Sequence, residues 1–314
     1  MSDMMKPGGL VGVRTLDARV FVVCCAIVGL IVVGGRALAG PKELEGLTIE
    51  LVSEDLAIRA GEPFAVGLSI SHSKGFHTYW KNPGIVGVPT GIEWELPAGF
   101  KAGPIEWPAP QLTKMAVYPV YGYEGKILLP VRITPPPDWS PGPEGKAFLK
   151  AKTSWMCCSA TCHPGFTDLT IGLPAAPTDS AGERAFTKWR PEFERARRSR
   201  PVKTNAWQVS ASRVGDSVTV EVKAGDSANR AIVEALESIY FFSGDGLIDS
   251  RAEQKIERIG EAGIRLSLTV SEFEPVSKAA EKTPNPRLAG VLSAERSWLS
   301  GKKVLAITLN VPLE

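Results

Sequence analysis

The chain has 314 residues, of which 44% are hydrophobic and 22% are charged, with 31 Gly and 25 Pro. This length exceeds one typical sandwich domain and suits two domains. Frequent Gly and Pro between short Val, Ile and Leu runs favour an all-β fold. The 36 basic and 34 acidic residues nearly balance. This balance argues against nucleic-acid binding, which needs a basic face to displace phosphate counterions.

The first 39 residues are typical of an export signal. A basic start precedes an apolar run over residues 20–33, and Ala37-Leu38-Ala39 fits a small-x-small cleavage site. We therefore expect residues 1–39 to be removed on export, which leaves 32 basic and 32 acidic residues. The alternative is a retained membrane anchor, although the run is shorter than the ~20 residues that span a bilayer.

Strand-like patterns fill residues 47–173. Apolar residues alternate with polar ones over 47–51, 64–70, 92–96 and 127–133, and this period of two indicates strands with one buried face. Breaks are expected at Asn82-Pro83-Gly84, Pro97-Ala98-Gly99 and Pro135-Pro136-Pro137. Several short strands with such breaks predict a β-sandwich over residues 40–177.

Two further segments follow. Residues 178–204 are crowded with charges around Phe186, Trp189 and Phe193, which predicts a short amphipathic linker helix on the surface, with Pro191 as a break. Residues 205–314 contain alternating runs at 218–222, 264–270 and 305–309 and a helix pattern at 227–238. We predict a second β-sandwich-like domain with a supporting or docking role, because this part has no Cys or His.

Cleavage would leave three cysteines, Cys157, Cys158 and Cys162. Export places them in an oxidising compartment, where disulfides persist, and an odd number leaves one thiol over. A disulfide between residues this close constrains the unfolded chain little, so a chemical role is more plausible than a stabilising one. A local structural disulfide remains the alternative.

The strand pattern places these cysteines at a hairpin. Residues 149–155 alternate, and the same parity predicts Cys157 to be buried and Cys158 to face water. Residues 169–173 form the returning strand, so Cys158 and Cys162 flank the open end of the hairpin within disulfide range. The neighbouring His163 either favours a thiolate or is only a turn residue, and we favour the second because adjacent strand residues point apart.

Several motifs resemble one family. They are Gly75-Phe-His-Thr-Tyr-Trp80-Lys-Asn-Pro-Gly84, Ile92-Glu-Trp-Glu-Leu-Pro97, Ile105-Glu-Trp-Pro-Ala-Pro110, Tyr121-Gly-Tyr-Glu124 and Trp155 followed by Cys158-x3-Cys162. Together they resemble the N-terminal domain family of the thiol:disulfide interchange protein DsbD, in the form found in ScsB-type ectodomains. The resemblance is dense over residues 45–175 and looser beyond.

This resemblance implies two immunoglobulin-like sandwiches and a periplasmic location. Cys158 and Cys162 match the family's redox pair, and Val120, Tyr121, Gly122 and Tyr123 match the loop that caps it. For Tyr121 and Tyr123 the alternative is ordinary packing. The family passes electrons from a membrane thiol transporter to periplasmic thioredoxin-like proteins. Family proteins carry their own membrane and thioredoxin domains, so here we expect partners on separate chains. No cofactor is expected.

Two questions stay open at this stage. Cys157 could replace Cys158 in the pair. A second class of function is Cu(I) binding by Cys157, Cys158, Cys162 and His163, a compact soft-ligand cluster. A third is a non-catalytic binding module with a structural disulfide.

Overall fold

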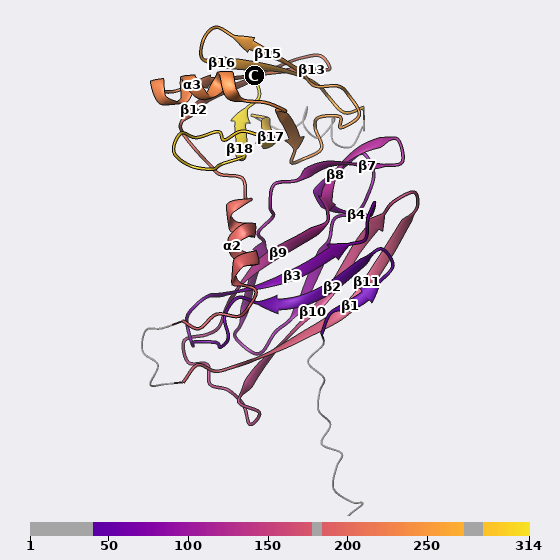
Figure 1. The fold of residues 1–314 in the computed structure, drawn as a ribbon, viewed down its shortest axis with the longest axis vertical. Coiled ribbons are helices and arrows are strands. Elements are labelled where there is room, and N and C mark those ends of the chain that lie inside the picture. Colours follow the sequence, from indigo (N-terminus) through magenta and orange to yellow (C-terminus); the bar gives the residue numbers. More distant parts are fainter. Residues whose placement is uncertain (1–39, 178–183, 273–284) are drawn as a thin grey trace, which may run out of the picture. The chain divides into compact units, whose positions relative to one another are not determined.

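The computed structural model describes residues 40–177, 184–272 and 285–314 (Figure 1). The predicted signal peptide, residues 1–39, lies outside the described residues, as does part of the predicted linker. Within these residues, no helix is long and apolar enough to cross a membrane.

Residues 42–174 form two antiparallel sheets. The first has the strand order β1-β2-β3-β9-β6, and the second has the order β11-β10-β4-β8-β7, with β5 pairing the middle of β10. The first sheet contains β1 (Lys42–Leu44), β2 (Leu47–Ser53), β3 (Phe64–His72), β9 (Lys126–Thr134) and β6 (Lys101–Ile105). The second contains β11 (Cys162–Pro174), β10 (Lys146–Cys158), β4 (His77–Gly84), β8 (Tyr118–Glu124), β7 (Gln111–Met115) and β5 (Gly91–Glu95).

The inner faces of these two sheets share one core. Leu68 and Ile70 of β3 are fully buried, as are Leu149 and Ala151 of β10, and all four belong to one apolar cluster. Each large side chain buried in this way contributes about 1.5–3 kcal/mol relative to exposure. The predicted alternation thus produces a sandwich, and the all-β immunoglobulin-like fold is confirmed.

One predicted break is confirmed and one is wrong. Strand β4 ends at Gly84, the last residue of Asn82-Pro83-Gly84, and its pairing with β8 shifts register between Tyr79 and Gly84. Pro191, in contrast, does not break a helix. It lies in the first turn of α2 (Arg190–Arg198), where the missing N–H has no intrahelical partner to lose.

Residues 207–312 form two further sheets. One has the order β12-β13-β16-β15 and the other β14-β17-β18. Their bounds are β12 (Trp207–Val214), β13 (Ser217–Ala224), β16 (Gly263–Thr269), β15 (Lys255–Ile259), β14 (Tyr240–Ser243), β17 (Arg287–Ser293) and β18 (Ala306–Pro312). Both sheets contribute to one buried cluster, in which Val220 of β13 and Leu292 of β17 are fully buried.

The helix predicted at 227–238 is α3 (Ser227–Ala235). It begins where the Asp226 carboxylate accepts a hydrogen bond from the Asn229 backbone N–H over 2.8 Å. This is an N-cap, which satisfies one of the N–H groups that a helix start leaves unpaired.

Candidate redox site

The site lies at the open end of the hairpin formed by β10 and β11. Cys158 and Cys162 are direct cross-strand partners, and they form a disulfide with a Cα–Cα distance of 4.2 Å. Thirteen-residue strands on both sides hold them in register. The pattern of alternation therefore correctly predicted that the two residues meet across a hairpin.

The two cysteines differ in exposure. Cys162, the first residue of β11, is an exposed residue, whereas Cys158 is 0% exposed. The expectation that Cys158 faces water is wrong. Its side chain does point away from Cys157, as its parity requires, but other residues cover it. An incoming thiol can therefore reach Cys162 and not Cys158.

The cover over Cys158 is a small apolar cluster. Tyr79 of β4 and Val120 of β8 are fully buried against Cys158, and Val86, Met115 and Met156 pack around them. The Tyr79 hydroxyl donates a hydrogen bond to Cys158 Sγ over 3.0 Å and lies 3.9 Å from Cys162 Sγ. Burial raises the pKa of Tyr79 to about 12, so this hydroxyl keeps its proton at neutral pH.

His77 supports Tyr79 from the same strand. The two rings meet edge to face, with centroids 5.1 Å apart. His77 is 1% exposed, and its Nε2 has no hydrogen-bond partner. Burial lowers the pKa of this imidazole, because a buried cation loses its hydration. His77 is therefore a neutral packing group at pH 7, and it fixes the ring that carries the Tyr79 hydroxyl.

The comparisons with known proteins agree with this geometry. Residues 49–174 match the family described as thiol:disulfide interchange protein DsbD, N-terminal. These residues form a domain of the DsbD N-terminal family. With its Cys158–Cys162 disulfide, this domain is a thiol–disulfide exchange module.

One solved structure shows the same fold beyond the matched segment. The N-terminal periplasmic domain of ScsB from Proteus mirabilis aligns with a TM-score of 0.59 and 16% identity, covering 87% of this chain and 97% of that one. Titin fragments I67-I69 and A168-A170 align at TM-scores of only 0.19 and 0.17, with 9% and 11% identity, covering 86% of this chain in each case and 66% and 65% of theirs. The comparison with curated proteins finds no match.

Cys157 takes no part in the disulfide of this DsbD-type domain. It is a free thiol, 0% exposed, within the core between the two sheets. Burial raises the pKa of the Cys157 thiol to about 11, which keeps it protonated and unreactive at neutral pH. Cys157 and Cys158 lie on opposite faces of β10, so exchange of the disulfide from Cys158 to Cys157 would require the strand to turn over.

The four residues considered for Cu(I) do not converge. His163 pairs with Cys157 across the hairpin, on the face opposite to Cys162, and its Nε2 lies 2.9 Å from the Thr161 hydroxyl. Cys158 and Cys162 are bonded to each other. Among the described residues, no group of three or more His, Cys, Asp or Glu side chains is arranged to hold a metal ion.

The four residues matched to the family's cap all lie in strand β8. Only Val120 faces Cys158. Tyr121 and Tyr123 point into the sandwich core, where the Tyr123 hydroxyl donates to the Pro108 carbonyl over 2.8 Å. Gly122 lets β8 approach β4, because a Cβ there would collide with the backbone carbonyl of Thr78. The three residues beyond Val120 thus position the cover without touching the sulfur atoms.

Residues of the C-terminal half hold two segments beside the disulfide. The Ser250 hydroxyl donates to the Pro119 carbonyl and accepts from the Ile85 N–H, each over 3.2 Å. Phe242 packs edge to face on Tyr121, with centroids 5.0 Å apart. Ile85 and Pro119 adjoin Val86 and Val120 of the cover, so these contacts fix the segments that shield Cys158.

Sequence reasoning missed Tyr79, His77, Met115 and Met156 as neighbours of the disulfide. The sequence did indicate that His77 and Tyr79 lie on one face of a strand, because they are two residues apart in a segment that also carries the family resemblance. What was lacking was the strand pairing: β4 meets β10 only at His77 and Cys158, and no local pattern predicts a single long-range pair.

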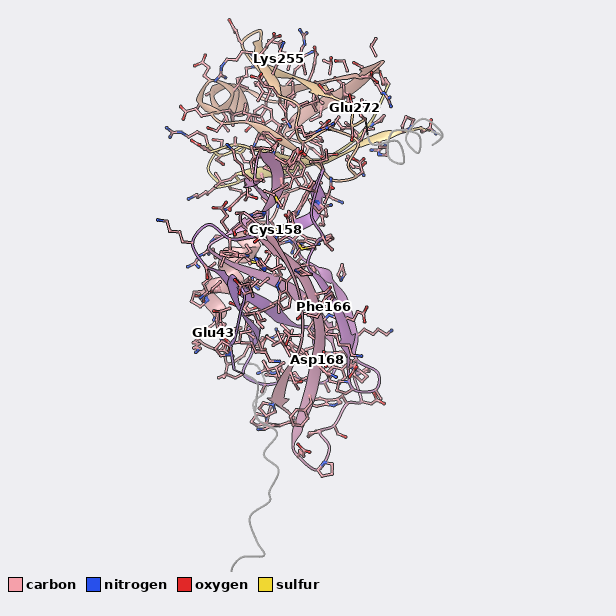
Figure 2. All side chains as sticks on the ribbon, turned by 90° about the vertical axis from the view of Figure 1, so that its right-hand side faces the viewer. Glu43, Cys158, Phe166, Asp168, Lys255 and Glu272 are labelled. Carbon is pink, nitrogen blue, oxygen red and sulfur yellow. A yellow bond between two sulfur atoms is a disulfide. The ribbon has the colours of Figure 1, made fainter. Side chains whose placement is uncertain are left out.

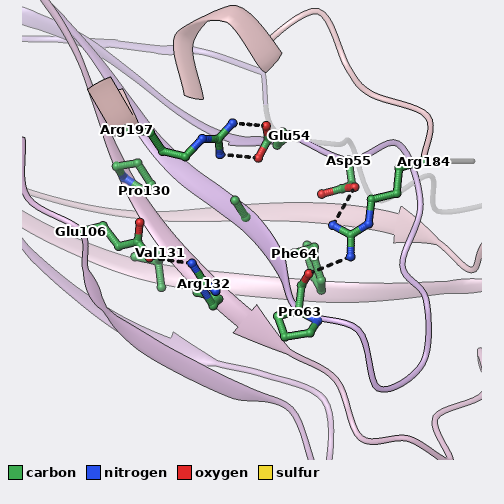
Figure 3. A pocket seen from close by; sticks show the side chains of 11 residues that line it. Glu54, Asp55, Pro63, Phe64, Glu106, Pro130, Val131, Arg132, Arg184 and Arg197 are labelled. Atoms are coloured by element: carbon green, nitrogen blue, oxygen red, sulfur yellow. Dashed lines mark hydrogen bonds and ion pairs between the residues drawn. The ribbon is translucent and has the colours of Figure 1, made fainter. Parts of the chain in front are cut away.

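A separate cavity of about 180 Å³ lies between β3, β9 and the segment that leads into α2. Figure 3 shows its ion pairs, in which Arg197 of α2 holds Glu54 through two hydrogen bonds of 2.8 and 2.5 Å. Burial raises the pKa of Asp55 although Arg184 lies beside it. No predicted site residue lines this cavity, and its Arg197–Glu54 pair joins α2 to the residue that follows β2.

Proposed function

We propose that this chain exchanges its Cys158–Cys162 disulfide with cysteine pairs of other proteins in the periplasm. The observation that supports this most is the asymmetry of the pair: Cys162 is an exposed residue, and Cys158 is buried beside a hydroxyl donor. An inert structural disulfide needs neither feature, whereas exchange needs an accessible sulfur and a stabilised leaving group.

The geometry supports one order of steps. A partner thiolate attacks Cys162 Sγ and forms a mixed disulfide, while the bond between Cys158 and Cys162 breaks. Cys158 leaves with the electron pair, and the Tyr79 hydroxyl stabilises the new thiolate by hydrogen bonding. The second thiol of the partner then attacks the partner's first sulfur in the mixed disulfide and releases Cys162 as a thiol. Two electrons and two protons have moved from the partner dithiol to this pair.

The reverse sequence reduces the next protein. The Cys162 thiolate attacks a disulfide of the acceptor, and Cys158 then attacks Cys162 Sγ to release the reduced acceptor. We propose that the donor is a membrane thiol transporter and that the acceptors are periplasmic thioredoxin-like proteins. Membership of residues 49–174 in the DsbD N-terminal family supports both assignments.

The division of labour along the chain is also a proposal. Residues 40–177 would carry the chemistry, residues 178–204 would link, and residues 205–314 would support the redox domain. The buried cluster that both C-terminal sheets share supports this division, as do the Ser250 contacts with Ile85 and Pro119. Residues 1–39 would direct export.

Trapping with single cysteine variants tests the proposed order. Cys158→Ser leaves the exposed Cys162 without a resolving thiol, so we expect it to accumulate mixed disulfides with protein partners. Cys162→Ser is the matched control and should trap far less. We expect a reduction potential of roughly −200 to −270 mV for the wild-type pair. A potential well below about −300 mV without trapped partners would show a structural disulfide instead.

A further inference from the structure

Strand β11 presents one continuous exposed row that begins at the reactive sulfur. Alternate residues of this strand, namely Cys162, Pro164, Phe166 and Asp168, are exposed, and the residues between them are at least partly covered. Because side chains alternate between the faces of a strand, these four lie on one face of the sheet. Figure 2 labels Cys158, Phe166 and Asp168 along this pair of strands.

Phe166 is the unexpected member of this row. Phe166 is 77% exposed, whereas a phenylalanine ring in a folded protein is usually buried. It pairs with Ser154 across the hairpin, and the half-buried Met156 lies on the same face of β10 between Ser154 and Cys158. The outer face between Phe166 and the disulfide is therefore largely apolar.

The distance along the strand places Phe166 inside any protein interface centred on Cys162. Four residues of a strand span about 13 Å. A standard protein–protein interface covers about 800 Å² on each partner, a disc of roughly 16 Å radius. A protein whose thiol bonds to Cys162 Sγ must therefore cover the Phe166 ring, unless the interface is much smaller than usual.

Beyond Phe166 the same face becomes charged but balanced. Lys150 pairs with Asp168 at 2.9 Å and with Glu95 at 3.3 Å, and Lys152 pairs with Glu95 at 2.5 Å. The charges of these side chains cancel, so they form a polar border whose electrostatic potential is neither strongly positive nor strongly negative. An apolar centre inside a polar border is the usual anatomy of an interface.

We propose that the Phe166 ring, with Pro164 and Met156, is the docking surface for the protein that presents its thiol to Cys162. This inference rests on the proposed exchange function and specifies how its partner is recognised. The fitting partner is a folded dithiol protein with an apolar surface around its reactive cysteine. Small thiols reach Cys162 without touching Phe166, so the surface accelerates exchange with proteins only.

The test compares a protein thiol with a small one. The oxidised full chain is mixed either with reduced thioredoxin or with dithiothreitol, and the second-order rate of disulfide reduction is measured for each. Phe166→Ser is expected to lower the rate with thioredoxin about tenfold or more, as loss of an interface anchor does, and to change the rate with dithiothreitol less than about twofold. Phe166→Leu should keep most of the thioredoxin rate.

A matched control is available in the C-terminal half. Val214 of β12 is 81% exposed, and Val214→Ser should leave both rates unchanged. Equal rates of disulfide reduction by thioredoxin for wild type and Phe166→Ser would overturn the proposed docking surface but not the proposed exchange function. A wild-type chain that thioredoxin reduces no faster than dithiothreitol would overturn the proposed exchange function as well. A wild-type dimer that Phe166→Ser converts to a monomer would assign the surface to self-association and overturn the proposal.

Discussion

The Tyr79 hydroxyl lies 3.0 Å from Cys158 Sγ but 3.9 Å from Cys162 Sγ. This difference assigns the two sulfur atoms different tasks, since a hydrogen-bond donor stabilises the sulfur that carries negative charge. The buried Cys158 therefore has the better environment for the leaving thiolate, although burial alone would disfavour any charge there. The Sγ atom of the exposed Cys162 is then the one that forms disulfide bonds with partners.

Replacing Tyr79 by Phe removes this donor without creating a large cavity. A hydrogen bond to a charged group contributes about 1.5–3 kcal/mol, so we expect the pKa of the reduced Cys158 thiol to rise by about 1–2 units. Exchange at neutral pH should slow correspondingly. The pKa can be measured from thiolate absorbance in residues 40–314 carrying Cys157→Ala and Cys162→Ser, where Cys158 is the remaining thiol.

Tyr118 offers the matched control for this experiment, because its ring is 44% exposed at the start of β8. Tyr118→Phe should leave the pKa of Cys158 unchanged. If Tyr79→Phe gave the same pKa as wild type, the hydroxyl would have no part in stabilising the thiolate.

Cys157 should behave as a buried apolar residue. In the reduced native protein we expect Cys162 to react first with a chromogenic disulfide reagent, the covered Cys158 more slowly, and Cys157 only after unfolding. Cys157→Ala should cost about 1–2 kcal/mol of unfolding free energy through the cavity it leaves, with exchange unchanged. Rapid modification of all three thiols in the native state would contradict this assignment.

The raised pKa of Cys157 also predicts a loss of stability in alkali. Its folded-state pKa is about 11 against an unperturbed 9.0, so above pH 9 the unfolded chain releases a proton that the folded protein retains. The contribution of this group is complete below pH 9 and is lost as pH rises from about 9 to about 11. Denaturant unfolding of wild type and Cys157→Ala across this range should reveal the difference.

His72 predicts the opposite dependence in acid. Its Nδ1 donates to the Gly125 carbonyl over 2.7 Å, so the neutral ring accepts at Nε2 from the Thr78 hydroxyl over 3.0 Å. Burial lowers the pKa of His72 from 6.5 to about 4. Because the unfolded chain binds the proton first, this stability is present above pH 6.5 and is lost as pH falls to about 4.

We expect the effect of His72 to be on the order of 1–2 kcal/mol, since the ring is only half-buried and solvent reduces the full shift. His72→Asn should be less stable than wild type at pH 7 and should lose less stability between pH 7 and pH 4.5. The unfolding free energies of both proteins can be measured by chemical denaturation at each pH. Equal losses of stability in wild type and His72→Asn would exclude His72 as the source.

The Arg197–Glu54 pair should stabilise the attachment of α2. Glu54 is 7% exposed, so Arg197→Ala leaves a buried carboxylate without its partner and should cost about 1–3 kcal/mol. Arg198, one residue further along the helix, is 70% exposed and pairs with Glu194 at 3.7 Å. Arg198→Ala should cost less than about 0.5 kcal/mol. Equal unfolding midpoints for the two variants in urea would contradict this interpretation.

Much of the fold could be predicted from local pattern. The alternation at residues 64–70 and 127–133 became β3 and β9, which are paired with each other, because a period of two is a property of each strand alone. The hairpin of Cys158 and Cys162 was predictable for the same reason, since both strands and the turn are contiguous in sequence.

The burial of Cys158 could not be predicted in this way. Parity states which face of β10 a side chain occupies, and it was right for both Cys157 and Cys158. Whether that face meets water depends on Tyr79 and Val120, which arrive from distant strands.

The disulfide closes a ring with a sequence separation of only four residues. By loop-closure entropy, such a short ring contributes only about 2 kcal/mol to stability, whereas the full-length ladder between β10 and β11 holds both cysteines in place whether or not they are bonded. Gaining or losing two electrons therefore leaves the architecture intact. The oxidised and the reduced domain therefore present the same conformation to successive partners.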